Sequence, residues 1–360
     1  MRQQTSTRYE RTQEGSAIPS IAIVGTGANG AAIGADLAEA GHDVTFIEQW
    51  PAHVEAIRRN GIRIETPEEK VLIDVPVLHF CEVATLRRKF DVVLMLVKAY
   101  DTRWACELVK PYLADDGIAV GLQNGMSIDD MAEILGAERT LGAVIEISSA
   151  MFEPGVVDRH SPRSRSWFAV GSLGSATAGR EEEIASLLRH SGAVDVVADI
   201  RSAKWMKLVI NAAELVPSAI LDLSIAEAAH YPGMKEVMAG AGYEAVDAAL
   251  AAGRSVVPIF GLTTVDQSNP HGFVDTLMDI LLDKYVLAHT LSTVLQDWIK
   301  TRRSEVDQIN GRVVEELSRI GRKAPINDVV VQLAHRIELG ELERSTDHLP
   351  ALRAALPHPG

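Results

Sequence analysis

The sequence predicts two domains, in which a doubly wound parallel α/β sheet is followed by an all-α domain. A chain of 360 residues has about twice the length of a common single domain. Short apolar runs alternate with helical stretches up to about residue 200, and the later patterns are helical alone. These observations, together with a glycine-rich turn directly after the first apolar run, lead to this fold class.

The first apolar run begins at Ile21. This run, IAIVG at 21–25, is followed by glycines, by a stretch of small residues and by a second apolar run, VTFIE at 44–48. A strand, a glycine turn, a helix and a second strand within about 28 residues form a βαβ unit whose strands pair in parallel. The sequence therefore predicts a sheet of the Rossmann type at the start of the chain.

Further strands and helices of this domain follow the same alternation. Strands are expected at 71–77, 92–97, 118–121, 140–147, 167–171 and 194–197. Helical stretches lie between several of them, at 53–59, 102–113 and 180–190. Residues 21–200 are therefore predicted to form the Rossmann domain.

Beyond this domain the helical patterns are longer. They cover 203–214, 233–252, 272–300 and 304–321. We therefore expect an all-α domain at 201–344 that contributes to a substrate site. The polar segment 1–20 is expected to be a disordered extension, and the proline-containing segment 345–360 a loosely held tail.

Composition and charge exclude several classes of protein. Hydrophobic residues make up 47% of the chain and charged residues 23%, which is the balance of a globular protein. Lys and Arg total 35 against 49 Asp and Glu, and the net charge of −14 argues against non-specific binding to nucleic acid or anionic membranes. No apolar run is long enough to span a membrane, and the start of the chain lacks the apolar segment of a secretory signal. We therefore expect a cytoplasmic protein.

The residue types that bind metals are too few or too scattered for a metal site. Cys81 and Cys106 are the two cysteines, which excludes a disulfide framework and a multi-cysteine metal site. The 11 histidines include no pair with the spacing of a helical metal motif. The sequence therefore predicts no metal.

The glycine-rich turn has the spacing of a dinucleotide site. Gly25, Gly27 and Gly30 stand in the order GTGANG, directly after a predicted strand and at the start of a predicted helix. The first glycine permits a tight turn, the second lets the backbone approach a pyrophosphate, and the third permits close packing of helix on strand. The helix N-terminus, with Ala28 and Asn29 in its first turn, offers N–H groups and a positive dipole to the phosphates. These residues are therefore predicted to bind a dinucleotide.

The end of the second strand bears on the choice of cofactor. Glu48 stands there, where a carboxylate accepts hydrogen bonds from the adenosine ribose hydroxyls and repels a 2′-phosphate. Its neighbour Gln49 is neutral, and no Arg or Lys follows until Arg58. The pattern favours NAD(H) as the cofactor, with NADP(H) as the alternative, although Glu48 is also interpretable as a solvated acid at a strand end.

Five blocks of sequence carry a resemblance to a known family. They are VGTGANG at 24–30, LVKAYDT at 96–102, LQNG at 122–125, KWMKLVINAA at 204–213, and LSTVLQDW with SEVDQING at 291–298 and 304–311. From about Ile21 to Gly340 the chain resembles the ketopantoate reductase (2-dehydropantoate 2-reductase) family. Each block alone is unspecific, but five in order with suitable spacing indicate membership.

The resemblance implies a Rossmann domain, a helical C-terminal domain and a cleft between them for a 2-keto acid. The family reaction is the reduction of a 2-keto acid to a 2-hydroxy acid by nicotinamide hydride. The lysine of the W-x-K-L-x-x-N block, here Lys207, would be the catalytic acid, with Asn211 beside it. The glutamate of the last block, here Glu305, would bind a substrate hydroxyl.

Three further residues match positions near cofactor and substrate in the family. By the resemblance, Lys98 would lie near the cofactor, Asn124 near the nicotinamide ribose and the substrate, and Thr293 would take the place of a substrate-contacting serine. Lys98 and Asn124 also follow two predicted strands directly, which is where open α/β sheets place their ligands.

Elementary chemistry supports the role of the lysine. Hydride that arrives at a carbonyl carbon leaves negative charge on the oxygen, so a cation or an acid must meet that oxygen. Lys207 supplies both, and in the oxidative direction it would serve as the base. Lys207 and Asn211 are four positions apart on a predicted helix and therefore project from one face.

The sequence departs from the family's pattern in three respects, one of which is the polar segment 1–20, since many members are shorter and lack it. NADPH-dependent members often carry a basic residue where this chain has Glu48 and Gln49. The lysine helix often shows a second asparagine, whereas Glu214 and Leu215 stand in that region here. Glu214 lies on the same helix face as Lys207, where it would raise the pKa of the lysine, contact the substrate and disfavour a second substrate carboxylate. We therefore expect an NAD(H)-dependent 2-keto acid reductase or 2-hydroxyacid dehydrogenase whose substrate is ketopantoate or a related acid.

Two other functions stay open at this point. One is a β-hydroxyacid dehydrogenase of the hydroxyisobutyrate type, which also combines a Rossmann domain with a helical lysine and asparagine. The other is a non-catalytic regulator that binds NAD(H). An apolar stripe in 277–295 is interpreted first as core and second as a dimer seam, and the resemblance is compatible with a homodimer.

Overall fold

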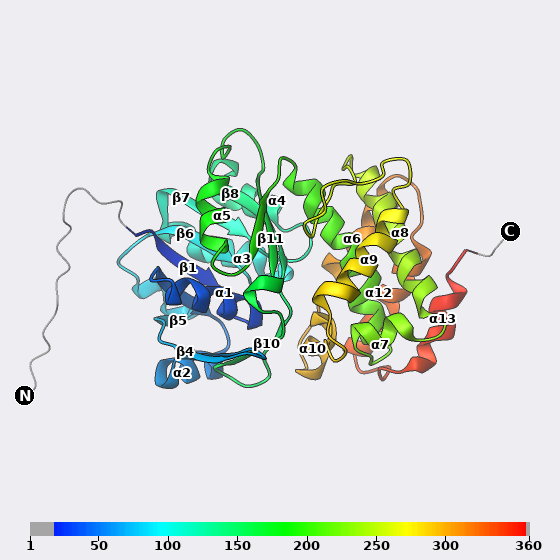
Figure 1. Ribbon diagram of the computed structural model, residues 1–360, viewed down its shortest axis with the longest axis horizontal. Helices are drawn as coiled ribbons and strands as arrows, with labels where there is room; N and C mark the ends of the chain where they lie inside the picture. Colours follow the sequence, from blue (N-terminus) through cyan, green and yellow to red (C-terminus); the bar gives the residue numbers. More distant parts are fainter. Residues whose placement is uncertain (1–17, 358–360) are drawn as a thin grey trace, which may run out of the picture.

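The computed structural model describes residues 18–357, in which an α/β half and a helical half lie side by side (Figure 1). Most of the segment 1–20, for which a disordered extension is expected, lies outside the described residues. Ser20 is the first residue of strand β1 (Ser20–Val24).

The α/β half is built on an eight-stranded sheet with the order β12–β11–β8–β7–β6–β1–β2–β5. The strands from β5 to β8 are parallel to one another, β11 is antiparallel to β8, and β12 is parallel to β11. The strands that join β1 in this sheet are β2 (Asp43–Glu48), β5 (Val77–His79), β6 (Phe90–Met95), β7 (Leu113–Gly121), β8 (Thr140–Glu146), β11 (Trp167–Ser172) and β12 (Ala193–Val196). The predicted doubly wound parallel sheet is confirmed.

Strand β1 lies in the middle of this sheet and fixes the position of the ligand cleft. Ile21 pairs with Val44 of β2 on one side and with Val92 of β6 on the other. The order of the strands reverses here, because the chain continues from β2 outward and later returns to β6. Ligands of open α/β sheets bind at the carboxyl ends of the strands beside such a reversal.

Helices cover both faces of the sheet because successive strand residues point to opposite sides. Ile21 and Ile23 pack into one apolar cluster, and Ala22 and Val24 pack into another. The first cluster includes α1 (Ala28–Glu39), α2 (Pro51–Asn60) and α5 (Glu181–Leu188), and the second includes α3 (Thr102–Val109) and α4 (Ile128–Leu135).

The prediction of a single strand at 71–77 is wrong. The segment is divided between β4 (Lys70–Ile73) and β5, and Pro76, which has no N–H to donate to a strand partner, lies between them. Strand β4 belongs to a second sheet with the order β4–β3–β10–β9, formed with β3 (Ile62–Glu65), β9 (Ser149–Ala150) and β10 (Val156–Arg159). Arg159 ties this sheet to α1, because its Nη1 lies 2.6 Å from Asp36 Oδ2 in a buried ion pair.

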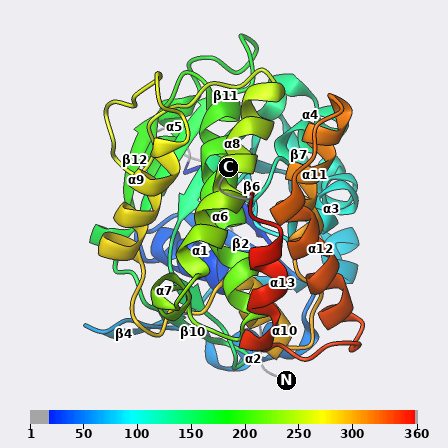
Figure 2. The same cartoon turned by 90° about the vertical axis from the view of Figure 1, so that its right-hand side faces the viewer.

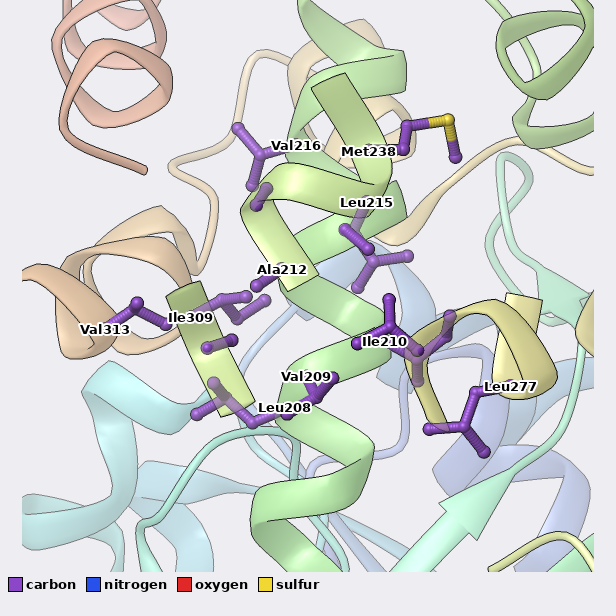
Figure 3. Packing of buried hydrophobic residues seen from close by; sticks show 14 of the residues in the cluster. Leu208, Val209, Ile210, Ala212, Leu215, Val216, Met238, Leu277, Ile309 and Val313 are labelled. Carbon is purple, nitrogen blue, oxygen red and sulfur yellow. The ribbon is translucent and has the colours of Figure 1, made fainter. Parts of the chain in front are cut away.

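The helical half is organised around α6 (Ile200–Ile220), of which every residue except Arg201 is buried. The helices around it are α7 (Ile225–His230), α8 (Met234–Ala251), α9 (Gly272–Ile280), α10 (Thr293–Ile299), α11 (Asn310–Arg319) and α12 (Pro325–Glu338). Figure 2 shows α9 on one side of α6 and α8, and α11 and α12 on the other. Figure 3 shows the apolar contacts, with Leu208 and Ile210 of α6 near Ile309 and Leu277. The predicted all-α second part is confirmed.

The helix expected at 272–300 is interrupted. A π-helical turn at Leu281–Tyr285 follows α9, and α10 begins only after Ser292, whose hydroxyl accepts a hydrogen bond from Leu295 N. The expected apolar stripe is therefore not one helix face, and Leu277, Leu281 and Leu295 lie in the core. A homodimer stays a prediction.

The prediction of a loosely held tail at 345–360 is wrong for most of that segment. A 3₁₀ turn and helix α13 (Leu349–Ala354) occupy it, and the Leu352 side chain is fully buried in the core of the helical half. Residues 358–360 lie outside the described range. Among the described helices, none has both the length and the apolar character that a bilayer crossing needs.

Candidate active site

A cleft lies between the two halves, where the carboxyl ends of β6, β7 and β8 face α6 and α10. The predicted site residues that line it are Gly27, Ala28, Asn29, Gly30, Lys98, Asn124, Lys207, Asn211, Glu214, Thr293 and Glu305. Gly25 and Glu48, the other two predicted site residues, are not part of its lining. The structure therefore brings together side chains from five separate blocks of the sequence.

The glycine turn forms one wall of the cleft. Gly25 has a φ of +89°, and a Cβ atom there would lie 2.5 Å from the backbone N of Val97. A Cβ at Gly30 would lie 2.2 Å from the Gly25 carbonyl oxygen, whereas no atom lies within 4 Å of the corresponding position at Gly27. The turn is thus closely packed on its inner side and open at the N-terminus of α1, which fits the pyrophosphate of a dinucleotide.

The opposite wall carries the lysine that the sequence analysis singled out. Lys207 of α6 forms an ion pair with Glu146, the last residue of β8, and the two residues are 9% and 8% exposed. The Lys207 Nζ also lies 5.3 Å from the centre of the Phe260 ring. These contacts hold an ammonium group in the cleft at a fixed position.

Two asparagines connect the walls beside this lysine. Asn211, one helical turn after Lys207, donates a hydrogen bond from Nδ2 to Asn124 Oδ1 over 3.0 Å. Asn124 belongs to the turn after β7, which Gln123 anchors by donating from Nε2 to the Val97 carbonyl oxygen over 2.9 Å. This hydrogen bond joins Asn211, which was expected beside Lys207, to Asn124 across the cleft.

A second buried lysine of α6 contacts the protein backbone and not the cleft. Lys204 donates from Nζ to the carbonyl oxygens of Gln123 and Ala143, over 2.8 and 3.1 Å. Burial lowers the pKa of Lys204 to about 8. It does not line the cleft, so Lys207 is the lysine of α6 that a ligand would meet.

A third group of charges lies between Lys98 and the helical half. Lys98 Nζ is 2.6 Å from Asp297 Oδ2 and 3.5 Å from Glu305 Oε2, and Ala99 N donates to Glu305 Oε1 over 2.8 Å. Burial alone would lower the pKa of Lys98, but the Glu305 and Asp297 carboxylates raise it above its ordinary value. Lys98 is therefore a cation that joins the two halves at the edge of the cleft.

Comparison with known proteins identifies the family. The model described as "Ketopantoate reductase PanE/ApbA" matches residues 21–172, and the model described as "Ketopantoate reductase PanE/ApbA C terminal" matches residues 199–338. The chain belongs to the ketopantoate reductase family. Membership makes it an oxidoreductase, and it indicates a nicotinamide cofactor and a small keto acid substrate.

Relatives of known activity and solved structure cover most of the chain. The 2-dehydropantoate 2-reductase of Archaeoglobus fulgidus is 26% identical over 331 residues, which are 90% of this chain and 99% of that protein. A crystal structure of a PanE/ApbA family ketopantoate reductase from Ralstonia eutropha is 27% identical, with a TM-score of 0.74 over 89% of this chain and 99% of that one. The structure of D-mandelate dehydrogenase with NADH and anilino(oxo)acetate shares the fold, with 22% identity and a TM-score of 0.78 over 89% of this chain and 98% of that one.

Within this ketopantoate reductase fold, Glu48 is buried and its carboxylate is fully used by the protein. Oε2 accepts hydrogen bonds from the Thr26 N and Oγ1 atoms, over 2.6 and 3.0 Å. Oε1 accepts from Gln49 N and Trp50 N, over 2.8 and 2.9 Å. A carboxylate has about four acceptor positions, so Glu48 would have to release one of these donors to accept a bond from a ribose hydroxyl.

Glu214 and Thr293 are the cleft residues with unsatisfied polar atoms. Neither Glu214 Oε2 nor Thr293 Oγ1 has a hydrogen-bond partner within residues 18–357, although both atoms are buried. Burial raises the pKa of Glu214 to about 8; Lys207 opposes this effect and Glu146 adds to it. Unpaired buried polar atoms in a cleft are the groups that a bound ligand would satisfy.

Several charged residues of the cleft were missed by the sequence analysis. Asp297 lies inside a quoted block, LSTVLQDW, and the spacing of that block gave no reason to single it out. Glu146 is the second-to-last residue of the strand predicted at 140–147, and this position near the carboxyl edge of the sheet was a usable signal. Lys300 and Arg302 also line the cleft, and no local pattern indicates this.

The described part of the chain contains no group of three or more His, Cys, Asp or Glu side chains arranged to hold a metal ion. The absence of a metal from this site stays a prediction.

Proposed function

We propose that this ketopantoate reductase family member transfers hydride between a nicotinamide dinucleotide and a 2-keto or 2-hydroxy acid, with Lys207 as the general acid or base. One observation carries the proposal. The buried Lys207 ammonium, paired with Glu146, faces the same cleft as the open glycine turn at the N-terminus of α1.

The residues of the α/β half would hold the cofactor. The backbone N–H groups of Gly27, Ala28 and Asn29 begin α1 and would bind the phosphates. Asn124, at the carboxyl end of β7, would contact the nicotinamide ribose, and Lys98 would lie near the cofactor at the end of β6. When bound, the nicotinamide ring supplies or accepts the hydride.

Lys207 would act on the substrate oxygen. In reduction its ammonium stabilises the negative charge on this oxygen and then donates a proton from Nζ. Glu146 keeps the side chain in place, and Asn211, which uses one amide hydrogen on Asn124, has a second one for the same oxygen. In oxidation Lys207 accepts the proton instead.

The remaining cleft residues would select the substrate. Glu214, Thr293 and Glu305 are proposed to contact it, the first two through the polar atoms that lack protein partners. The apolar lining favours a branched or aromatic side chain on the 2-keto acid. The part of it that the helical half contributes includes Leu215, Ile225, Leu281, Val286 and Leu291. A second substrate carboxylate is disfavoured because the Glu146 carboxylate already neutralises the Lys207 ammonium. Glu214, whose pKa of about 8 keeps it protonated below that pH, would contact the substrate as a hydrogen-bond donor. Ketopantoate and phenylglyoxylate both have the favoured type of side chain.

NADH is proposed as the preferred form of the cofactor. Glu48 stands at the end of β2, and its carboxylate, bound by backbone N–H groups, is a fixed negative charge that would repel a 2′-phosphate. Because its acceptor positions are used, charge is the larger part of its proposed effect, and hydrogen bonding to the ribose is the smaller part.

The proposed function is tested by following the absorbance of the reduced nicotinamide with ketopantoate and phenylglyoxylate. Wild-type protein, Lys207→Met and the matched control Lys235→Met, an exposed lysine of α8, are compared with NADH and with NADPH. We expect Lys207→Met to lose about 10²–10⁴-fold in turnover while NADH affinity stays unchanged, and Lys235→Met to behave like wild type.

The other outcomes separate the alternatives. Turnover by Lys207→Met at the wild-type rate would reject the role of the lysine. Tight NADH binding without turnover of any 2-keto or 2-hydroxy acid would indicate a non-catalytic regulator. Oxidation of 3-hydroxy acids alone would indicate a dehydrogenase of the hydroxyisobutyrate type.

A further inference from the structure

One segment of the helical half crosses to the α/β half through a row of basic residues. We define the strap as residues 297–305, the segment that begins in the last turn of α10 and ends shortly before α11. Three of its side chains lie on aromatic rings of the α/β half. Lys300 Nζ is 5.4 Å from the centre of the Phe152 ring. Arg302 Cζ is 4.7 Å from the centre of the Trp50 ring, and Arg303 Cζ is 4.9 Å from the centre of the Tyr100 ring.

The contacts of Arg302 place one end of the strap beside the glycine turn. Trp50, under the Arg302 guanidinium, donates from its backbone N to Glu48 Oε1 over 2.9 Å. The other oxygen of Glu48 accepts from the backbone N of Thr26, two residues before α1, over 2.6 Å. Arg302 is therefore connected to the residue two positions before α1 through Trp50 and Glu48.

The contacts of Lys300 link the strap to the same helix end through a second segment. Lys300 Nζ is 3.4 Å from the Met151 carbonyl oxygen. Ser149, at the start of the same segment, donates a hydrogen bond from its hydroxyl to Asn29 Oδ1 in the first turn of α1. Lys300 and Arg302 are thus each linked to the first residues of α1 through a short series of contacts.

The charges of Lys300 and Arg302 face the cleft and are poorly neutralised. Both residues line the cleft together with Gly27, Ala28 and Asn29. Among residues 18–357, no carboxylate forms an ion pair with Lys300 or with Arg302. Arg303 differs in both respects, because it is not part of the lining and its Nη2 lies 3.0 Å from Asp307 Oδ2.

The surroundings of Lys300 also favour an anion. Burial lowers the pKa of Lys300 to about 8; Asp297 opposes this, whereas the charges of Lys98 and Arg302 act in the same direction as burial. A negative group bound between Lys300 and Arg302 would stabilise both cations.

We propose that Lys300 and Arg302 bind the pyrophosphate of the dinucleotide from the side opposite to the N-terminus of α1. The inference rests on the proposed function in one respect, since it requires a dinucleotide in the cleft. The N–H groups of α1 would hold the two phosphates from below, and two cations from the helical half would neutralise their two negative charges from above. Cofactor binding would then involve both halves of the protein, although the glycine turn belongs to only one.

The test is equilibrium binding without substrate, measured by the fluorescence change on titration with NADH. The variants are Arg302→Gln, Lys300→Gln and the matched control Arg303→Gln, which removes a neighbouring cation with the same kind of aromatic contact outside the cleft. We expect each of the first two to weaken NADH binding about tenfold, the usual effect of one charge-assisted hydrogen bond. Arg303→Gln is expected to bind within about twofold of wild type.

Two further measurements locate the contact and control for folding. ADP, which carries the diphosphate without the nicotinamide, should lose the same factor as NADH in Arg302→Gln. Arg302→Lys, which keeps the charge, should recover part of the affinity. Thermal unfolding of each variant without ligand establishes that its affinity is that of the folded protein.

The outcomes that would overturn the inference differ from those that would overturn the proposed function. If wild type binds neither NADH nor NADPH, both are wrong. If wild type binds NADH and Arg302→Gln binds it as tightly as Arg303→Gln does, only the role of the strap is wrong. If Arg302→Gln weakens NADPH alone, the guanidinium serves the 2′-phosphate, and the assignment to the pyrophosphate is overturned.

Discussion

Replacement of Glu214 by Gln should change how the stability of the protein depends on pH. The Glu214 side chain is 2% exposed, and its Oε2 atom has no hydrogen-bond partner in the described part of the chain. Burial raises the pKa of this carboxyl from 4.5 to about 8 in the folded protein, with Lys207 opposing and Glu146 adding to the effect. In the unfolded chain the same carboxyl ionises near its ordinary pKa.

The sign and size of the effect follow from these two values. Between pH 4.5 and about 8 the unfolded chain has released a proton that the folded protein keeps, so the free energy of unfolding falls as pH rises. At about 1.4 kcal/mol per pH unit, the full change is about 5 kcal/mol. The amide introduced by Glu214→Gln has no proton to release, and the cost of burying it, about 1–3 kcal/mol, is the same at every pH.

The assay is urea unfolding of wild type and Glu214→Gln at several values between pH 5 and pH 8. We expect the variant to gain stability relative to wild type by several kcal/mol across this interval. Glu236→Gln, an exposed glutamate of α8, is the control and should show no such trend. A difference between Glu214→Gln and wild type that is equal at pH 5 and pH 8 would refute the reasoning, because it would mean that the carboxyl titrates alike in both states.

Three other substitutions test separate parts of the structure. Lys98→Met leaves Asp297 and Glu305 buried without their cation and should cost about 3–5 kcal/mol in urea unfolding, part of which Asp297→Asn should restore; an unchanged midpoint would contradict the buried ion pair. Gly30→Ala places a Cβ 2.2 Å from the Gly25 carbonyl oxygen, so NADH titration should show a large loss of affinity, and wild-type affinity would disprove the packing of this turn. Leu352→Ala should cost about 2–5 kcal/mol in thermal or urea unfolding if α13 is docked as described, and nothing if that segment is loose.

The parts of the fold and the site that the sequence predicted correctly depend on local patterns. The βαβ unit is recognisable because its glycine turn lies between two apolar runs of strand length. Lys207 and Asn211 share a helix face because their spacing matches the helical repeat. Lys98 and Asn124 fall at one edge of the sheet because the carboxyl ends of parallel strands meet there. Each of these arguments uses residues that are close in the chain or equivalent in a regular sheet.

The parts that were missed depend on how distant segments pack. The interruption at Pro76 sends β4 to a second sheet, and only the tertiary structure supplies that sheet with β9 and β10 as further strands. Helix α13 is held in place by two buried leucines, Leu349 and Leu352, a signal that is too short to recognise in a segment with several prolines. Glu146 meets Lys207 only because β8 and α6 lie side by side. Such pairs have no fixed spacing in the sequence.

The end of β2 shows how contacts between distant segments affect the choice of cofactor. An inference drawn from Glu48 alone considers one wall of the cofactor site and leads to NADH, because a fixed carboxylate repels a 2′-phosphate. Arg302 brings a positive charge to the neighbouring Trp50 from the other half of the protein. The choice between NADH and NADPH at the end of β2 therefore depends on two charges: the negative charge of Glu48, which is local in the sequence, and the positive charge of Arg302, which is distant in the sequence. In a two-domain enzyme, a residue at a strand end predicts cofactor choice only together with the segment that packs over it, and here that segment is the strap.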